Sequence, residues 1–271
     1  MNPLRSSAVP PTEGDSHRLR VATYNIHKGV RGVGPGKRLE IHNLGLAIEA
    51  LDADLVCLQE VRHFHHGEAR RFQRTSFGWP AQGQADFLAP DGYEVAYRTN
   101  AKTRDGEHGN ALLSRWPLGE VRHHDVSDHR FEQRGLLHVP VQWQGETVDV
   151  VVIHFGLSHT SRVRQVERLG DYLERTGRRD MPVLVAGDFN DWGERLDAPL
   201  RRHGLERAEA PAREPAARSR SMTFPSLAPV FALDRIYTRG LRCTSTFVPR
   251  GSNWARMSDH LPLVAEFERA T

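Results

Sequence analysis

Long hydrophobic runs are missing from this 271-residue sequence: no stretch approaches the roughly 18 apolar residues that a membrane-spanning helix requires. Cysteine is equally scarce, with only Cys57 and Cys243 present. Because both stand in apolar surroundings, we expect two small buried side chains rather than a disulfide framework. Residues 1–17 lack the apolar core of a secretory signal and are typical of a disordered leader. These features predict a cytoplasmic protein.

Several chemical motifs are also absent from the sequence. A glycine-rich loop ending in Gly-Lys-Ser/Thr is not present, which excludes phosphoryl transfer of the P-loop kind. The absence of Gly-x-Ser-x-Gly argues against a serine esterase, and no three nitrogen or sulfur ligands have the spacing of a catalytic zinc site. Charge is nearly balanced, with 37 Lys plus Arg against 34 Asp plus Glu, so an anionic substrate is permitted without requiring a nucleic-acid groove.

Strand and helix patterns are intermixed along the chain. Apolar periodicity predicts helices over 38–52 and 161–176. Several strands are too close together for helical crossovers, which favours mixed or antiparallel sheets with helices outside. No linker interrupts the pattern, so we expect one catalytic domain over residues 18–271, with irregular segments at 62–92 and 200–221. The predicted strands are 19–24, 54–60, 93–97, 110–113, 135–143, 147–154, 183–186, 232–237, 243–248 and 262–267.

Polar residues that can bind metal or move protons stand at or beside the predicted buried strands, mostly where a strand ends. Strand ends are rigid, so a site assembled from several of them holds its geometry well. The residues concerned are Asn25, Glu60, His154, Asp188, Asn190, Asp234, Asp259 and His260.

Each of these residues also has a simpler structural explanation. Glu60 can be the solvated end of a strand, and Asp188 with Asn190 has the pattern of an Asx turn. Asp234 lies inside an apolar strand, where a carboxylate needs a partner. The side chain of the adjacent Arg235 points to the opposite face, so His260 is the more economical partner. The occurrence of all these residues together favours a functional site.

The donor set favours magnesium. Mg²⁺ prefers a few protein oxygen ligands, with waters and substrate phosphate completing an octahedron. Glu60 is the natural first ligand, and Asn25 and Asp259 are candidates for direct or water-mediated support. We therefore expect Mg²⁺, with Mn²⁺ able to substitute.

With these residues in hand, the chain resembles the endonuclease/exonuclease/phosphatase superfamily, from about Leu19 to Phe267. The resemblance implies a DNase I-like fold, a four-layer α/β/β/α sandwich of two mixed β-sheets flanked by helices. Within the superfamily, Asn25-Ile26-His27-Lys28-Gly29 is similar to a little-characterised bacterial group. The motifs that carry the resemblance are Thr23-Tyr24-Asn25, Leu58-Gln59-Glu60-Val61, Gly187-Asp188-Phe189-Asn190, Leu233-Asp234-Arg235-Ile236 and Ser258-Asp259-His260.

The resemblance also implies roles for individual residues. Glu60 would bind Mg²⁺ with Asn25 and Asp259 in support. His260 would pair with Asp234, which fixes its tautomer, and would orient or deprotonate the attacking water, so that either His260 or Asp188 can be the general base. Asp188 would handle the proton of the attacking water or of the leaving group. Asn190 and His154 would hydrogen-bond the phosphate oxygens. Lys28 and Arg134 are additional candidates for phosphate contacts, for which a solvated surface position is the alternative.

These roles predict a Mg²⁺-dependent phosphoesterase that hydrolyses a phosphodiester, with a nuclease or general phosphodiesterase as the first expectation. The alternatives are a phosphoesterase acting on a phospholipid, sphingomyelin-type or inositol or sugar phosphate substrate, and a binding protein that has lost catalysis. Segment 62–80 carries arginines and aromatics, including Arg62, Phe72, Arg74 and Trp79, that suit nucleic-acid contacts or else a surface helix covering the core. We expect a monomer, although the sequence leaves the oligomeric state open.

Overall fold

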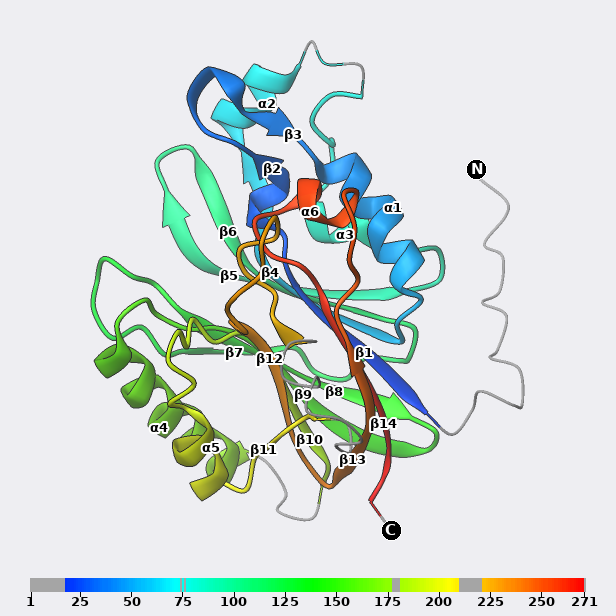
Figure 1. The fold of residues 1–271 in the computed structure, drawn as a ribbon, viewed down its shortest axis with the longest axis vertical. Helices are drawn as coiled ribbons and strands as arrows, with labels where there is room; N and C mark the ends of the chain where they lie inside the picture. Colours follow the sequence, from blue (N-terminus) through cyan, green and yellow to red (C-terminus); the bar gives the residue numbers. More distant parts are fainter. Residues whose placement is uncertain (1–17, 74, 76, 177–180, 210–220, 271) are drawn as a thin grey trace.

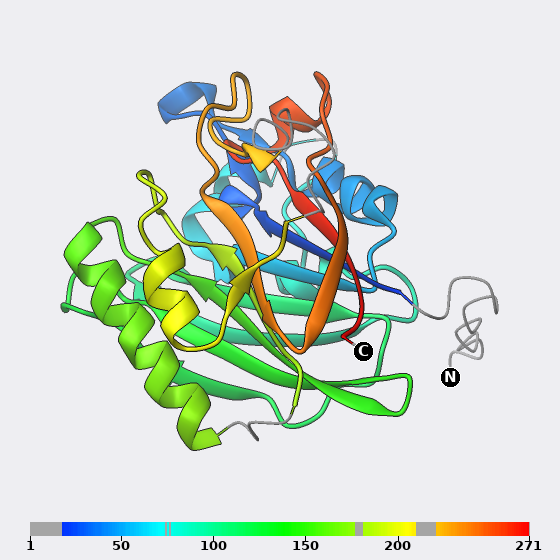
Figure 2. The same ribbon diagram turned by 60° about the horizontal axis from the view of Figure 1, so that its bottom comes forward.

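The computed structural model describes residues 18–73, 75, 77–176, 181–209 and 221–270. The predicted leader, Arg74 and residues 210–220 of the second irregular segment lie outside this part of the chain. Within it, two six-stranded mixed sheets stack face to face and helices cover both outer sides (Figures 1 and 2). The predicted four-layer α/β/β/α sandwich is therefore confirmed.

The first sheet has the strand order β13-β14-β1-β4-β6-β5, and the second has the order β11-β12-β10-β9-β8-β7. Two short strands, β2 and β3, form a separate hairpin. The strands are β1 (Leu19–Asn25), β2 (Val30–Arg31), β3 (Arg38–Leu39), β4 (Leu55–His65), β5 (Glu94–Thr103), β6 (Gly106–Ser114), β7 (Arg122–Asp125), β8 (Gly135–Trp143), β9 (Glu146–His154), β10 (Val183–Asp188), β11 (Glu206–Arg207), β12 (Asp234–Arg239), β13 (Leu241–Phe247) and β14 (Leu263–Arg269).

Helices α1, α2, α3 and α6 lie on the side of the first sheet, while α4 and α5 cover the second (Figure 1). Their bounds are α1 (Ile41–Leu51), α2 (His66–Phe72), α3 (Gln84–Leu88), α4 (His159–Thr176), α5 (Asp197–Arg202) and α6 (Trp254–Met257), with short 3₁₀ turns η1 (His27–Gly29) and η2 (Gly34–Gly36). In the part of the chain that the structure describes, no helix is long and apolar enough to cross a membrane.

Three layers of buried apolar side chains hold the sandwich together. The central layer lies between the sheets and includes Cys57, Trp143 and Val152, all 0% exposed. A second layer joins α1 to the first sheet, and a third joins α4 to the second. The alternation of strand residues between two apolar layers explains why both sheets have such continuous hydrophobic sequences. Cys57 and Cys243 are both free.

The structure differs from the sequence expectation mainly in the first sheet. Strand β4 continues past Glu60 to His65, so residues 62–65 are strand and not loop. Strands β5 and β6 form a hairpin that reaches well beyond the predicted 93–97 and 110–113. Strand β7 and helix α5 were not predicted at all. These segments lie at sheet edges or carry polar side chains, so their apolar pattern is weak.

Candidate active site

The second sheet brings three of the predicted site residues into one row. In the strand register, His154 of β9 lies opposite Asp188 of β10, which in turn lies opposite Asp234 of β12. Oδ2 of Asp188 lies 3.6 Å from Nε2 of His154 and 3.7 Å from Nε2 of His260. Asp188 is 1% exposed, and burial raises the pKa of its carboxyl despite the neighbouring histidines.

His260 joins this row through Asp234. Its Nδ1 lies 2.7 Å from Oδ2 of Asp234, the contact that the sequence predicts in place of Arg235. Burial alone would lower the pKa of His260, but the negative charges of Asp234 and Asp188 outweigh it and raise this pKa to about 10. Asp188, Asp234 and His260 keep ligand-capable atoms within 4.8 Å of one another. Asp234 and Asp188 keep His260 protonated, so its ring nitrogens offer no lone pair to a metal ion and the group suits proton transfer better.

The end of β10 and the turn that follows it fix the orientation of Asp188. Gly187 has φ +156°, and a Cβ there would lie 1.9 Å from the backbone oxygen of Ile153 on β9, so only glycine fits. The backbone N–H of Asn190 donates to Oδ1 of Asp188 at 2.9 Å, which is the predicted Asx turn. Nδ2 of Asn190 donates to the backbone oxygen of Phe155 at 3.0 Å. The Asx turn and a catalytic position are therefore compatible.

The first sheet contributes Asn25, the last residue of β1, and Glu60, which lies in the middle of β4. Nδ2 of Asn25 donates to Oδ2 of Asp188 at 3.1 Å, which links the two sheets directly. Glu60 stands at a β-bulge between Leu58 and Val61 and has φ +57°, a left-handed conformation that is uncommon for glutamate. Such strained positions occur where a site needs a side chain aimed away from the regular pleat.

Two carboxylates of the predicted metal set are each held by a basic side chain. Nζ of Lys28 lies 2.8 Å from Oε2 of Glu60, and Nδ1 of His27 lies 2.9 Å from Oδ2 of Asp259. Burial would raise the pKa of Glu60, but the charge of Lys28 outweighs it and lowers this pKa. The hydrogen bond from His27 likewise lowers the pKa of Asp259 against the effect of burial.

Oxygen donors that stay ionised and need positive charge suit Mg²⁺. The predicted metal residues therefore fit that ion, although Oδ1 of Asn25 already accepts the backbone N–H of His27 at 3.0 Å.

Arg134 directly precedes β8, and its side chain reaches the backbone of Phe155. Its Nε donates to the Phe155 oxygen at 3.1 Å, and its guanidinium lies 3.5 Å from Glu132. Burial, followed by the positive charge of Arg134, lowers the pKa of His154 to about 4. His154 is therefore neutral at pH 7, able to donate one hydrogen bond from its ring.

Comparisons with known proteins agree with this geometry. The family model described as "Endonuclease/Exonuclease/phosphatase family" matches residues 22–260. The protein belongs to the endonuclease/exonuclease/phosphatase family. Members of this family are hydrolases of phosphoester bonds and generally depend on a metal. A curated relative, "Uncharacterized protein YbhP" of Escherichia coli, is 34% identical over 260 residues, covering 94% of this chain and 98% of the relative.

Solved structures show the same fold at low sequence identity. A family protein from Beutenbergia cavernae has a TM-score of 0.71 at 20% identity, covering 94% of this chain and 72% of that one. The catalytic domain of human Nocturnin with bound sulfate has a TM-score of 0.68 at 22% identity, covering 93% and 95%. A family protein from Leptotrichia buccalis has a TM-score of 0.68 at 15% identity, covering 93% and 100%.

A buried ion pair that was not predicted from the sequence stabilises the segment that follows Asp188. Nη1 of Arg235 lies 2.7 Å from Oδ2 of Asp191, and both side chains are 1% exposed. The same guanidinium donates to the backbone oxygens of Asp191 and Ala232 at 3.0 and 2.9 Å. Arg235 thus ties the segment that follows Asp188 to the strand that carries Asp234.

An aromatic group beside His260 was also not predicted. The ring of Phe224 lies 4.9 Å from that of His260, and Trp192 contacts Phe224 and Phe231 at 5.4 and 5.1 Å. Trp192 and Phe231 are 42% and 37% exposed, and the nearby Leu227 is 72% exposed. Large exposed hydrophobic side chains such as these are a feature of contact surfaces.

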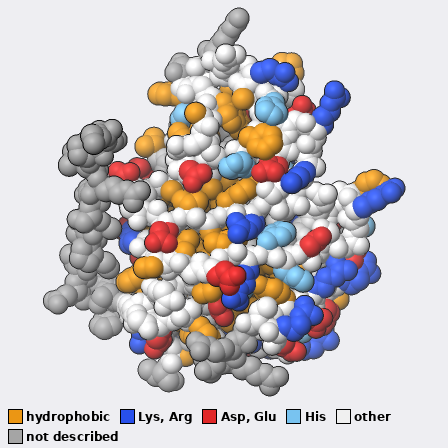
Figure 3. Space-filling model, turned by 180° about the vertical axis from the view of Figure 1, so that it is seen from behind, with side chains coloured by type: hydrophobic (Ala, Val, Ile, Leu, Met, Phe, Trp, Pro, Cys, Tyr) orange, Lys and Arg blue, Asp and Glu red, His pale blue; other side chains and the backbone are white. Residues whose placement is uncertain are grey.

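In segment 62–80, helix α2 lies at the surface and leaves Arg70 and Arg71 exposed, while other side chains of the segment are buried. Arg62 is 7% exposed and lies 3.5 Å from Glu68, while Phe72 is 4% exposed and stacks on Trp79. On the face seen in Figure 3, acidic, basic and hydrophobic side chains are interspersed. The surface-helix interpretation of this segment is therefore the better one.

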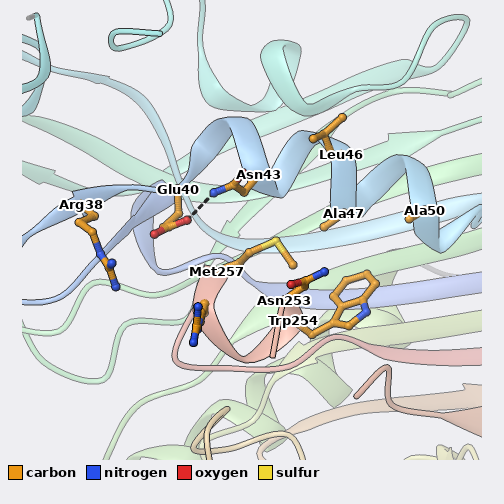
Figure 4. A pocket seen from close by; sticks show the side chains of 10 residues that line it. Arg38, Glu40, Asn43, Leu46, Ala47, Ala50, Asn253, Trp254 and Met257 are labelled. Atoms are coloured by element: carbon orange, nitrogen blue, oxygen red, sulfur yellow. Dashed lines mark hydrogen bonds between the residues drawn. The ribbon is translucent and has the colours of Figure 1, made fainter. Parts of the chain in front are cut away.

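A cavity of about 450 Å³ lies between α1 and α6 (Figure 4). Its lining includes Arg38, Leu46, Trp254 and Met257, and Asn43 donates to Glu40 at its edge at 2.7 Å. None of the predicted site residues lines it. The predicted site is therefore separate from this cavity.

Proposed function

We propose that the protein is a Mg²⁺-dependent phosphodiesterase in which water attacks the phosphorus and the bond to the leaving-group oxygen breaks. The observation that carries the proposal is the convergence of Asn25 and Glu60 from one sheet with His154, Asp188 and Asp234 from the other. A carboxylate held by a lysine, a His–Asp pair and a neutral histidine within one cluster suit phosphoester hydrolysis.

The protein's own groups divide the work as follows. Glu60, with Asp259 and Asn25 in support, would hold the metal, which supplies charge neutralisation at the phosphate when bound. Asp188 accepts a proton from the attacking water, because burial has raised its pKa toward the range of a useful base. His260 stays protonated and donates to a phosphate oxygen, with Asp234 fixing its orientation. His154 and Asn190 support the same oxygens, and Arg134 adds positive charge.

Nucleic acid is the substrate class that the site favours, which would make the protein a nuclease. The exposed rings of Trp192 and Phe231 contact each other, and Trp192 also contacts Phe224, which lies against His260. A nucleobase next to the scissile phosphate can stack on this group. A phospholipid headgroup is the second candidate, favoured by the exposed aliphatic side chains of Leu227 and Val230 in the same segment. The bound sulfate of the Nocturnin structure supports an oxyanion ligand for this fold.

The test is hydrolysis of a panel of substrates: single- and double-stranded DNA, RNA, phospholipid vesicles and sugar phosphates, each with Mg²⁺, Mn²⁺ or chelator. Glu60→Gln and His260→Ala should abolish product release in protein that circular dichroism shows to be folded. Glu68→Gln is the matched control, because Glu68 also pairs with a lysine, Lys37, outside the site. Undiminished turnover in Glu60→Gln and His260→Ala would disprove the assignment.

A further inference from the structure

Lys28 is presented to Glu60 by a turn whose backbone is fixed on all sides. His27, Lys28 and Gly29 have consecutive positive φ angles of 45°, 62° and 69°. Nε2 of Gln84 donates to the backbone oxygen of Lys28 at 2.8 Å. The backbone N–H of Glu40 donates to Gly29 at 2.9 Å. Any movement of the ammonium group must therefore come from rotation of the side chain alone.

The choice of lysine at this position is informative. The sequence contains only three lysines, at positions 28, 37 and 102, in a chain whose basic residues are otherwise arginines. A lysine ammonium is a compact point charge on a flexible stem, whereas a guanidinium is a planar fork. Lys28 thus places on Oε2 of Glu60 the kind of charge that a small cation would bring, at 2.8 Å.

The ammonium of Lys28 and a metal ion cannot both bind this Glu60 oxygen without strong repulsion. The Glu60 side chain is only 17% exposed, so water screens the two positive charges poorly. The Lys28 side chain is 30% exposed and has room to turn toward solvent or substrate. The neighbouring carboxylate of Asp259 is already engaged by His27. Once Glu60 is neutralised by another cation, the nearest new anionic partner for Lys28 is a phosphate at the site.

We propose that Lys28 is an internal counter-cation, which holds the Glu60 carboxylate in the metal-free protein and leaves it for a substrate phosphate oxygen when a divalent metal binds. This inference rests on the proposed function, since it assumes a metal at Glu60. It gives the site a built-in order: metal first, and then phosphate, whose contact with Lys28 becomes available only after the metal has entered. Metal binding is weakened by the competition, and phosphate binding is strengthened by the released charge.

Calorimetric titration with Mg²⁺ and Mn²⁺, without substrate, tests the competition. Lys28→Met should bind Mg²⁺ about tenfold more tightly than the wild type, which corresponds to roughly 1.4 kcal/mol. Lys28→Arg keeps the charge and should stay near the wild-type affinity. Lys37→Met is the matched control, because Lys37 pairs with Glu68 of helix α2, and it should change the affinity less than about twofold, or roughly 0.4 kcal/mol.

The presence of only three lysines allows a second readout that does not depend on activity. In protein labelled with ¹⁵N-lysine, the Nζ signal of Lys28 is assigned by its loss in Lys28→Met. Mg²⁺ should shift this signal and leave those of Lys37 and Lys102 in place, and inorganic phosphate added afterwards should shift it again. In the Lys28→Met variant, phosphate affinity measured in the presence of Mg²⁺ should fall.

Three outcomes separate the hypotheses. Equal or weaker Mg²⁺ affinity in Lys28→Met overturns the counter-cation proposal and leaves the phosphodiesterase proposal intact. A Lys28 signal that does not move at saturating Mg²⁺ does the same. Failure of the wild type and all variants to bind Mg²⁺ or Mn²⁺ overturns both proposals together, because then no metal competes for Glu60.

Discussion

The imidazole of His260 bridges two buried carboxylates, with Nδ1 at 2.7 Å from Oδ2 of Asp234 and Nε2 at 3.7 Å from Oδ2 of Asp188. Asp234 is 0% exposed and Asp188 is 1% exposed, so water screens neither charge effectively. This arrangement favours the imidazolium form and gives the two carboxylates different tasks. In the proposed mechanism, Asp234 orients the ring and Asp188 accepts a proton from the attacking water.

Substitution of Asp234 by Asn should slow the chemistry and also lower stability, because Asp234 is the main partner that keeps His260 protonated. An amide cannot hold the positive charge, so the pKa of His260 should fall from about 10 toward the ordinary range. Turnover should drop by roughly 10³- to 10⁴-fold, the scale seen when the carboxylate of a catalytic histidine is replaced by an amide. Nuclear magnetic resonance of labelled histidine measures the first effect and steady-state hydrolysis the second.

A second buried His–Asp pair supplies the control for that substitution. Nε2 of His138 lies 3.1 Å from Oδ1 of Asp149, at the opposite end of β9 from His154. Asp149→Asn removes a similar interaction without touching the site, so its turnover should stay near the wild-type value. A comparable loss in both variants would mean that the effect of Asp234→Asn comes from destabilisation.

The free energy of unfolding of the metal-free protein should pass through a maximum as pH varies. The pKa of His260 is raised to about 10, so its stabilising contribution is complete below about pH 6.5 and is lost as pH rises toward 10. Burial lowers the pKa of His154 and that of His108 to about 4 each, so their contributions are lost as pH falls from about 6.5 toward 4. Each proton taken up or released changes the slope by at most about 1.4 kcal/mol per pH unit.

Urea unfolding between pH 4.5 and 9.5, in the presence of chelator, measures both limbs. His260→Asn should flatten the alkaline limb only, and His154→Asn should reduce the slope of the acid limb only. Curves that stay parallel to the wild type across the whole range would contradict the assigned charge states.

The strand ends were predictable from sequence because each is a local pattern, an apolar run followed by a polar residue. Asp188 and His154 needed only the register of two neighbouring strands to come together. The pair of Arg235 and Asp191 was not predictable, because the partners are 44 residues apart and no local pattern marks either one as buried. The left-handed backbones of Lys28 and Glu60 likewise follow from tertiary contacts that override local preference.

Gly187→Ala should disturb both stability and catalysis. The new methyl group would meet the backbone oxygen of Ile153 at 1.9 Å, and neither strand can move without breaking the ladder. We expect a loss of at least about 2 kcal/mol in unfolding free energy, within the range for forced overpacking, together with a displaced Asp188 and reduced turnover. Gly45→Ala is the matched control, because nothing lies near a Cβ there and helix propensity should raise stability by about 0.5–1 kcal/mol. A Gly187→Ala protein as stable and active as the wild type would contradict the packing described for this turn.

Trp192 offers the most direct test of substrate class. If its exposed ring stacks on a nucleobase, Trp192→Ala should lower kcat/KM for a short oligonucleotide by about tenfold, since one stacked base contributes about 1–3 kcal/mol. The same oligonucleotide with an abasic residue beside the scissile phosphate should lose almost nothing, because no ring is left to stack.

Phe77→Ala is the matched control, because Phe77 is 80% exposed and contacts His42 of α1 instead of the site. An equal loss on both oligonucleotides would mean that Trp192 only supports the fold of the site. A loss confined to phospholipid vesicles would move the assignment to the phospholipid class, because Leu227 and Val230 would then contact acyl chains beside the same histidine.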